Sequence, residues 1–168
     1  MTPTKLRKLL IIRHAIAFER DARRWPNDAE RPLTHVGRRR FRCVARELAK
    51  FLDKPDQLLT SSLKRARQTA RILEEAAYPR AERVEELNPG AATDSVIAML
   101  AARSASCIAV VGHEPALSTL ISALLAGAGP TVRSRLKKGG IAVLQFEGDI
   151  ASGKGELLML IPPRLLHK

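Results

Sequence analysis

Short runs of consecutive apolar residues alternate along the chain with longer stretches in which apolar residues recur every three or four positions. Continuous runs rich in Leu, Ile and Val are typical of strands that are buried on both faces of a sheet. We expect strands at residues 8–14, 56–62, 81–87, 107–113, 139–147 and 155–162. The helical period predicts helices at residues 35–53, 63–77, 93–105 and 114–127.

The order of these elements predicts the fold class. Strands and helices alternate through most of the chain, which is the pattern of a largely parallel α/β sheet with helices on both faces. The last two strands follow each other without a helix and favour a hairpin, so the sheet should be mixed. We therefore expect a single domain over residues 1–168, built as a three-layer sandwich.

Capping residues indicate where two of the helices begin. Thr34 precedes the first helical stretch, and Thr93 or Asp94 opens the third. Hydroxyl and carboxylate side chains at these positions accept hydrogen bonds from the first free N–H groups of a helix. We expect Thr34 to cap the first helix and Thr93 or Asp94 to cap the third.

Composition places the chain among ordinary globular proteins and suggests its compartment. The 168 residues are 45% hydrophobic, and the apolar run at the N-terminal end is interrupted by Arg13 and His14. That run is too short for a signal peptide or a membrane span. Cys43 and Cys107 have no CxxC partner, so we interpret them as small, reduced core residues. We expect a cytoplasmic protein.

Positive charge is the unusual feature of the composition. Lys and Arg number 29 against 17 Asp and Glu, giving a formal net charge of +12. Five arginines crowd the first helical stretch: Arg38, Arg39, Arg40, Arg42 and Arg46. The charge either forms a solvated surface or meets an anionic partner. A basic nucleic-acid-binding module is one alternative, but aromatic residues make up only 4% of the chain, so base-stacking platforms are scarce.

Three predicted strands end on residues that carry chemistry. The first ends on Arg13 and His14, the later strand 107–113 ends on His113, and Arg65 follows the strand 56–62 in the first turn of a helix. Ligands of open α/β sheets bind at the carboxyl ends of strands. A histidine at a strand end is more often structural, but guanidinium groups fit phosphate oxygens and a neutral imidazole is a nucleophile. Together they predict a phosphoryl-transfer pocket that needs no metal.

Five segments in order extend this interpretation to a family. They are "LIIRHAIA", "RPLTHVGRRR", "LLTSSLKRARQTARIL", "VEELNPGA" and "IAVVGHEPALSTLI". The chain resembles the histidine phosphatase superfamily, whose fold is called phosphoglycerate-mutase-like. The short chain and "ELNPG" resemble the SixA-type phosphohistidine phosphatases of that superfamily. Ala15 stands where the superfamily pattern has glycine after Arg-His, a replacement that is common among SixA-like members.

The resemblance implies a role for each candidate residue. His14 corresponds to the catalytic histidine, which takes the phosphoryl group before water hydrolyses the intermediate. Arg13, Arg65 and His113 correspond to the groups that bind the phosphate oxygens. Glu86 corresponds to a glutamate that protonates the leaving group or activates water, although Glu85 is adjacent and a strand would point the two to opposite faces.

The resemblance also implies the cofactors and the partners. Neither a metal nor an organic cofactor is expected. The implied substrate is phosphohistidine of a signalling or phosphotransfer protein, with inorganic phosphate as product, and a small phosphorylated metabolite is the alternative. Neither nucleic acid nor a membrane is an expected partner. The segment from Ala17 to Pro32 is a candidate lid, and Trp25 within it either covers the pocket or packs locally.

Overall fold

The computed structural model describes residues 6–127 and 131–166, so His167, which we assign to a C-terminal tail, lies outside the described residues. Six strands form one sheet in the order β3-β2-β4-β1-β5-β6. Their bounds are β1 Leu6–Arg13, β2 Gln57–Thr60, β3 Ala81–Arg83, β4 Cys107–Gly112, β5 Ile141–Glu147 and β6 Glu156–Ile161. Strands β3, β2, β4 and β1 are mutually parallel, whereas β5 and β6 are antiparallel to their neighbours.

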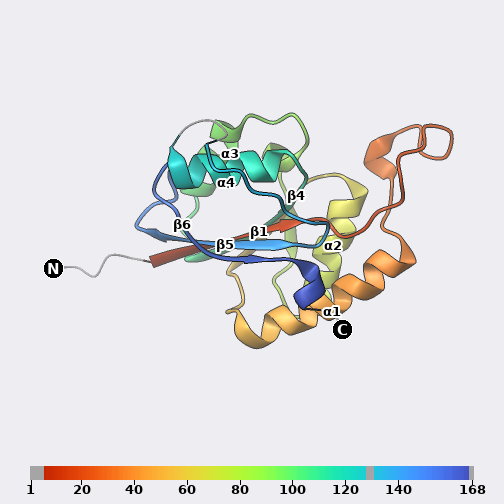
Figure 1. Cartoon of the computed structure of the whole chain (residues 1–168), viewed down its shortest axis with the longest axis horizontal. Helices are drawn as coiled ribbons and strands as arrows, with labels where there is room; N and C mark the ends of the chain where they lie inside the picture. The colour runs from red at the N-terminus through yellow and green to blue at the C-terminus, as the bar shows by residue number, and fades with distance from the viewer. Residues whose placement is uncertain (1–5, 128–130, 167–168) are drawn as a thin grey trace.

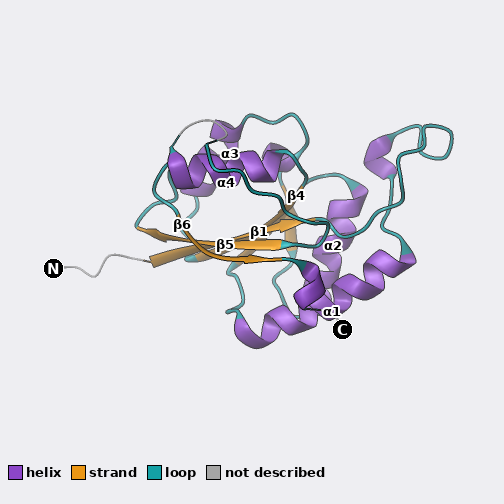
Figure 2. Cartoon of the chain, viewed as in Figure 1, coloured by secondary structure: helices purple, strands orange, loops and turns teal. Residues whose placement is uncertain are grey.

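Helices cover both faces of this sheet, which gives the expected three-layer sandwich (Figures 1 and 2). The helices are α1 His35–Phe51, α2 Lys64–Glu75, α3 Thr93–Ala101 and α4 Ala116–Ala126. Figure 1 shows α3 and α4 above the sheet and α1 below it, and α2 packs in the same core as α1. The predicted α/β class, the mixed sheet and the terminal hairpin are confirmed.

Strand β1 shows why an unbroken apolar run suits the centre of such a sheet. Leu9 and Ile11 point into the core under α3 and α4, whereas Leu10 and Ile12 point into the core over α1 and α2. All four side chains are at most 1% exposed. Because side chains alternate along a strand, only a continuous apolar run can fill two cores at once.

Several predicted boundaries differ from the structure. Thr34 caps α1 as expected, since its Oγ1 accepts a hydrogen bond from the N–H of Gly37 at 2.9 Å. The N-cap of α3 is instead Ala92, which has no capping side chain, so the prediction of Thr93 or Asp94 is wrong. The predicted strand 81–87 ends at Arg83, because its partner β2 ends at Thr60 and offers no further ladder.

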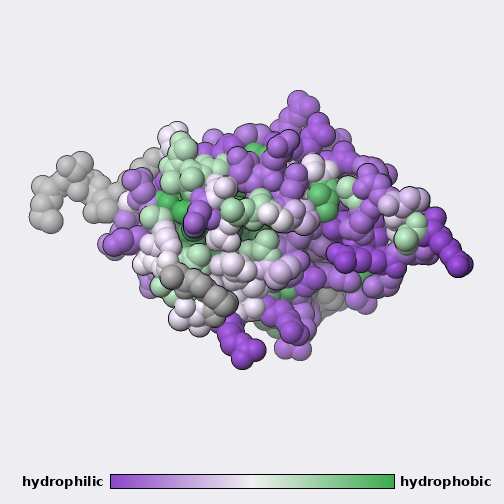
Figure 3. All heavy atoms as spheres, turned by 90° about the horizontal axis from the view of Figure 1, so that it is seen from above, coloured by the Kyte–Doolittle hydropathy of each residue, from purple (hydrophilic) through white to green (hydrophobic). Residues whose placement is uncertain are grey.

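The long segment between β1 and α1 is anchored rather than loose. It contains the 3-10 helix η1 Asp28–Glu30 and projects from the sandwich in Figure 1. Trp25 packs on Phe18 with ring centroids 5.8 Å apart, and Arg24 lies over both rings, so Trp25 has a packing role. Seen from above, hydrophilic atoms cover most of the end of the molecule that carries this segment (Figure 3).

Two further expectations concern the cysteines and the membrane. Cys107 is buried and Cys43 half-buried, and both are free thiols. Among the residues that the structure describes, no helix combines the length and the apolar character needed to cross a bilayer.

Candidate active site

Two histidines from distant parts of the chain meet at one edge of the sheet. His14 follows β1 and His113 follows β4, and these strands are parallel neighbours. The centroids of the two imidazole rings are 5.1 Å apart, and the residues are only 6% and 5% exposed. Ser61 follows β2 at the same edge. The parallel strands therefore bring together residues that are separated by about a hundred positions in sequence.

A hydrogen bond to the backbone fixes which nitrogen of His14 is free. Its Nδ1 lies 2.7 Å from the carbonyl oxygen of Ala15. A carbonyl oxygen can only accept, so Nδ1 carries the proton. In the neutral ring the lone pair then lies on Nε2, the nitrogen that a nucleophilic attack would use.

Burial keeps both imidazoles neutral. It is the main reason why the pKa of His14 falls from 6.5 to about 3, with the charges of Arg65 and Arg13 lowering it further. The pKa of His113 falls to about 3 for the same first reason, and its electrostatic interaction with His14 and with the two arginines lowers it further. Neutral imidazole is the nucleophilic form, and both rings stay in this form over the physiological pH range.

Two arginines supply positive charge beside these rings. The Nη1 of Arg65 donates to the backbone oxygen of Asp28 at 2.9 Å, and it lies 3.2 Å from the Asp28 carboxylate. The Nη1 of Arg13 donates to the backbone oxygen of Leu136 at 2.8 Å. Burial lowers the pKa of each guanidinium, but an arginine stays protonated in proteins. The edge of the sheet therefore carries two fixed positive charges.

Three side-chain nitrogens of this cluster lack a protein partner. Nε of Arg13, Nε of Arg65 and Nδ1 of His113 are buried without a hydrogen-bond partner among the described residues. Unpaired buried polar atoms are costly and are usually matched by a ligand or by water. Positive charge and unpaired donors together suit a bound oxyanion.

The other nitrogen of His113 is held by a serine. Ser61 Oγ lies within hydrogen-bond distance of His113 Nε2, at 2.6 Å, and the N–H of Leu63 donates to Ser61 Oγ at 3.4 Å. The Ser62 N–H and hydroxyl both donate to Asn88 Oδ1 at 2.8 Å, which ties the turn after β2 to the segment that carries Glu86. The turn after β2 therefore fixes the orientation of the His113 ring.

The secondary structure around Glu86 differs from the expected strand. Residues Glu85–Leu87 form the 3-10 helix η2 rather than a strand, so the alternation argument for Glu85 and Glu86 does not apply. Glu86 lines a small cavity together with His113, whereas Glu85 is exposed. Of the two carboxylates, Glu86 is the one that shares a cavity with His113.

Several positioning residues were missed by the sequence analysis. Asp28 accepts from Arg31 Nε at 2.7 Å and pairs with Arg65, and the hydrogen bond from Arg31 is the main reason why its pKa is lowered. Thr69 accepts from the N–H of Ala15 at 3.0 Å and donates to the Arg65 carbonyl at 2.8 Å. The "RARQT" segment signals Thr69, but no local pattern pairs Asp28 with a residue 37 positions away.

No group of three or more metal-ligating side chains occurs among residues 6–127 and 131–166. His35 lies at the start of α1 and is exposed, away from the histidine pair.

A family model and one relative match this chain. The family model of the histidine phosphatase superfamily (branch 1) matches residues 9–95. An uncharacterised protein of Picosynechococcus sp. is 34% identical over 166 residues, covering 95% of this chain and 98% of that protein.

Solved structures agree with the family. A protein of Nakamurella multipartitia assigned as the phosphohistidine phosphatase SixA matches with a TM-score of 0.78 and 27% identity, covering 94% of this chain and 96% of that one. The protein histidine phosphatase SixA in complex with tungstate matches with a TM-score of 0.79 and 26% identity, over 95% and 99% of the two chains. This chain belongs to the histidine phosphatase superfamily, in its SixA-type branch, and is a histidine-dependent phosphatase.

Proposed function

We propose that the protein removes the phosphoryl group from phosphohistidine on a signalling or phosphotransfer protein, with His14 as the nucleophile. The observation that carries the proposal is the state of His14: a neutral ring with Nδ1 bonded to the Ala15 carbonyl, between two guanidinium groups and a second neutral histidine. Phosphoryl transfer requires a nucleophile and, at the same place, groups that bind the phosphate oxygens.

In the first step, Nε2 of His14 attacks phosphorus and forms a new P–N bond. The P–N bond of the substrate breaks, and the leaving imidazole nitrogen takes a proton from Glu86. Arg13, Arg65 and His113 hold the equatorial oxygens and stabilise the charge that gathers on them in the transition state. The unpaired donors of these three residues gain partners in this step.

In the second step, water attacks the phosphohistidine formed on His14. Glu86 now accepts the proton that water loses, the P–N bond breaks toward His14, and inorganic phosphate leaves. Since the acid of the first step is the base of the second, one carboxylate beside His113 serves both.

Two observations favour a protein as substrate. The segment from Phe18 to Arg31 is tied to the rim of the site, because Arg31 donates to the Phe18 carbonyl at 2.6 Å and Asp28 pairs with Arg65. The regular structure within it is the three-residue helix η1, so it adds no separate cap domain over the histidines. Of the two SixA structures, which match above 25% identity, one is named as a phosphohistidine phosphatase and the other as a protein histidine phosphatase, the latter in complex with tungstate, a tetrahedral oxyanion.

A side-by-side turnover assay tests the substrate class. Phosphohistidine protein, phosphohistidine peptide and small phosphomonoesters are compared by kcat/KM under the same conditions. We expect the phosphohistidine substrates to be hydrolysed at least about tenfold more efficiently. Preferential hydrolysis of phosphomonoesters would make a phosphorylated metabolite the substrate instead.

Treatment with a chelator tests whether the phosphoryl oxygens are bound without a metal ion. Two arginines already supply the positive charge that a divalent ion would bring to the phosphoryl oxygens. Turnover should therefore survive prolonged EDTA treatment unchanged. Loss of turnover that a divalent ion restores would mean that a metal takes part in the reaction.

A further inference from the structure

A groove lies on the far side of the segment that follows His14. It has a volume of about 420 Å³ and runs between α1 and the C-terminal 3-10 helix η3 Pro163–Leu165. Its accessible apolar surface comes from the half-buried residues Ile16, Pro162 and Pro163, and Phe41 lies buried beneath them. This volume is in the range that holds one large apolar side chain and its neighbours.

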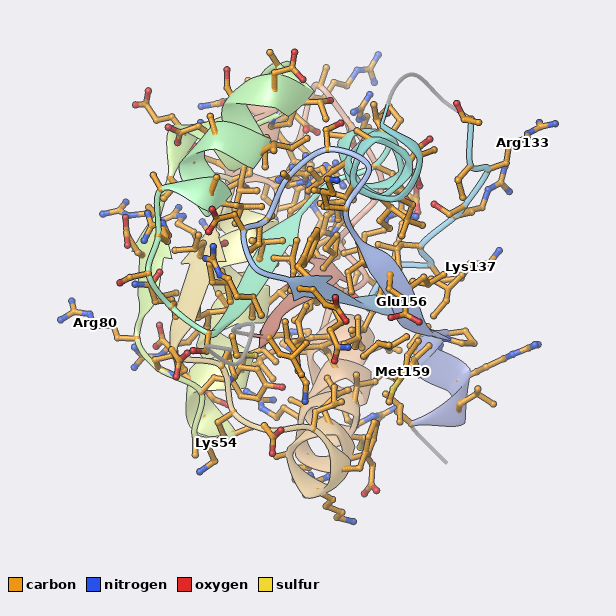
Figure 4. All side chains as sticks on the ribbon, turned by 90° about the vertical axis from the view of Figure 1, so that its left-hand side faces the viewer. Lys54, Arg80, Arg133, Lys137, Glu156 and Met159 are labelled. Carbon is orange, nitrogen blue, oxygen red and sulfur yellow. The ribbon has the colours of Figure 1, made fainter. Side chains whose placement is uncertain are left out.

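The rim of this groove is basic. Arg40 comes from α1, Lys137 from the segment before β5, and Arg164 from η3, and all three are exposed. None of the three forms an ion pair with another described residue, whereas Lys138 lies 3.6 Å from Glu19. No Asp or Glu lines the groove. In Figure 4, Lys137 projects from the side of the molecule on which η3 also lies.

The groove borders the segment that carries His14. Its wall includes Ala15, whose Cα is about 3.8 Å from that of His14 along the chain. Gly139 also lines it, and the N–H of Gly139 donates to the carbonyl oxygens of Arg13 and His14 at 3.1 and 3.0 Å. Gly37 permits the close approach of α1, since a Cβ there would overlap the Ile16 carbonyl oxygen.

We propose that this groove binds an acidic segment of the substrate protein that carries one apolar side chain close to the phosphohistidine. The proposal rests on the proposed function. The occupant follows from complementarity: unpaired cations on the rim match carboxylates, and the apolar floor matches an aliphatic or aromatic side chain. A protein substrate can present both on a segment near its phosphohistidine, because the groove borders Ala15, the residue that follows His14.

Peptide substrates test the proposal with a matched pair of variants. One phosphohistidine peptide carries Glu residues and one Leu within four positions of the phosphohistidine, and a second has Gln in place of each Glu. The groove variant is Arg40→Gln with Arg164→Gln. The control is Arg39→Gln with Arg46→Gln, which removes the same charge from exposed positions of α1 that border a different surface depression.

We expect the wild type to prefer the Glu peptide by about tenfold in kcat/KM, on the scale of a few charge-assisted contacts. The groove variant should lose most of this preference and the control should keep it. Phosphoramidate, which is too small to reach the groove, should be hydrolysed equally by all three proteins. Equal losses in both variants, or no preference in the wild type, would overturn the proposal.

A binding measurement separates this proposal from the proposed function. The unphosphorylated Glu peptide is titrated into wild type and into the groove variant by calorimetry, which needs no turnover. Binding that weakens at least fivefold in the groove variant supports the groove, even if phosphohistidine is not the substrate. Hydrolysis of phosphohistidine without any such binding would exclude the groove as a binding site for the substrate and would leave the proposed function unaffected. Binding of anionic vesicles in place of the peptide would also overturn it.

Discussion

The two sides of the short segment from Arg13 to Ile16 are built on opposite principles. On one side, His14, His113 and Arg65 are at most 6% exposed, and each is held by a neighbour: His14 by the Ala15 carbonyl, His113 by Ser61 and Arg65 by the Asp28 carbonyl. On the other side, Arg40, Lys137 and Arg164 are exposed around an apolar groove. Catalysis and substrate recognition therefore need different surroundings, because charges act strongly only when they are desolvated and positioned.

The buried side is suited to chemistry and the open side to recognition. A buried guanidinium and a neutral imidazole need no reorganisation when a phosphoryl group arrives. Exposed lysines and arginines are screened by water and salt, so each adds little alone but several together select a partner. If this division is right, variants on the buried side change kcat strongly, and variants on the open side change kcat/KM only for large substrates.

The largest effect is expected from His14→Ala. It removes the proposed nucleophile, so turnover should fall by at least about 10³-fold while the protein stays folded, as losses of catalytic nucleophiles do elsewhere. The control is His35→Ala, which removes an exposed histidine at the start of α1. Steady-state assays and thermal melting check both. Near-normal turnover of His14→Ala would exclude it as the nucleophile.

The next largest effect is expected from Arg65→Ala, with Arg71→Ala as the control. Arg65 is buried beside both histidines, whereas the side chain of Arg71 on the same helix is 75% exposed. Losing one preorganised charge donor should lower kcat by about 10²–10³-fold. Similar kcat values in the two variants would place the phosphate away from Arg65.

Stability against pH probes the burial of the two histidines. In the folded protein the pKa of each is lowered from 6.5 to about 3, so between these values the unfolded chain binds more protons. The free energy of unfolding should therefore fall as the pH is lowered from about 6.5 toward 3, and these groups should not affect it above that range. Urea titrations of wild type and His14→Asn measure it.

The free energy of unfolding should decrease less steeply with falling pH in His14→Asn than in the wild type. His35→Asn should show the same pH dependence as the wild type. Identical slopes in all three proteins would mean that the histidine pair is hydrated rather than buried.

The smallest effect on the buried side is expected from Ser61→Ala. This change removes the hydroxyl 2.6 Å from His113 Nε2, and a typical net hydrogen bond contributes about 0.5–1.5 kcal/mol, or about two- to tenfold in rate. Ser95→Ala, at an exposed position of α3, serves as the control. If Ser61 positions His113, Ser61→Ala lowers kcat while KM for small substrates stays the same. A loss as large as that of Arg65→Ala would give Ser61 a direct role in the chemistry.

Much of this fold could be predicted because its signals are local. The run from Leu9 to Ile12 can only fill a two-sided core, and Thr34 marks the start of α1 through a single capping hydroxyl. The meeting of strand ends at one edge follows from parallel topology, so the approach of His14 to His113 could be predicted as well.

The parts that could not be predicted depend on long-range contacts. The Asp28–Arg65 pair forms because an irregular segment folds back over α2, and no periodicity encodes that path. The 3-10 turn at Glu85 arises because β2 is too short to pair with it. The groove combines residues near positions 15, 40, 137 and 163, so it exists only after the C-terminal segment has packed against α1.

The most direct test of the central role of His14 is to trap the intermediate. Wild type and His14→Ala are mixed briefly with substrate carrying labelled phosphate, quenched in base, digested and mapped by mass spectrometry. Covalent phosphate on His14 of the wild type, stable in base and labile in acid, with none on the variant, is the result we predict. Phosphate on another residue, or an intermediate that persists in His14→Ala, would contradict the account.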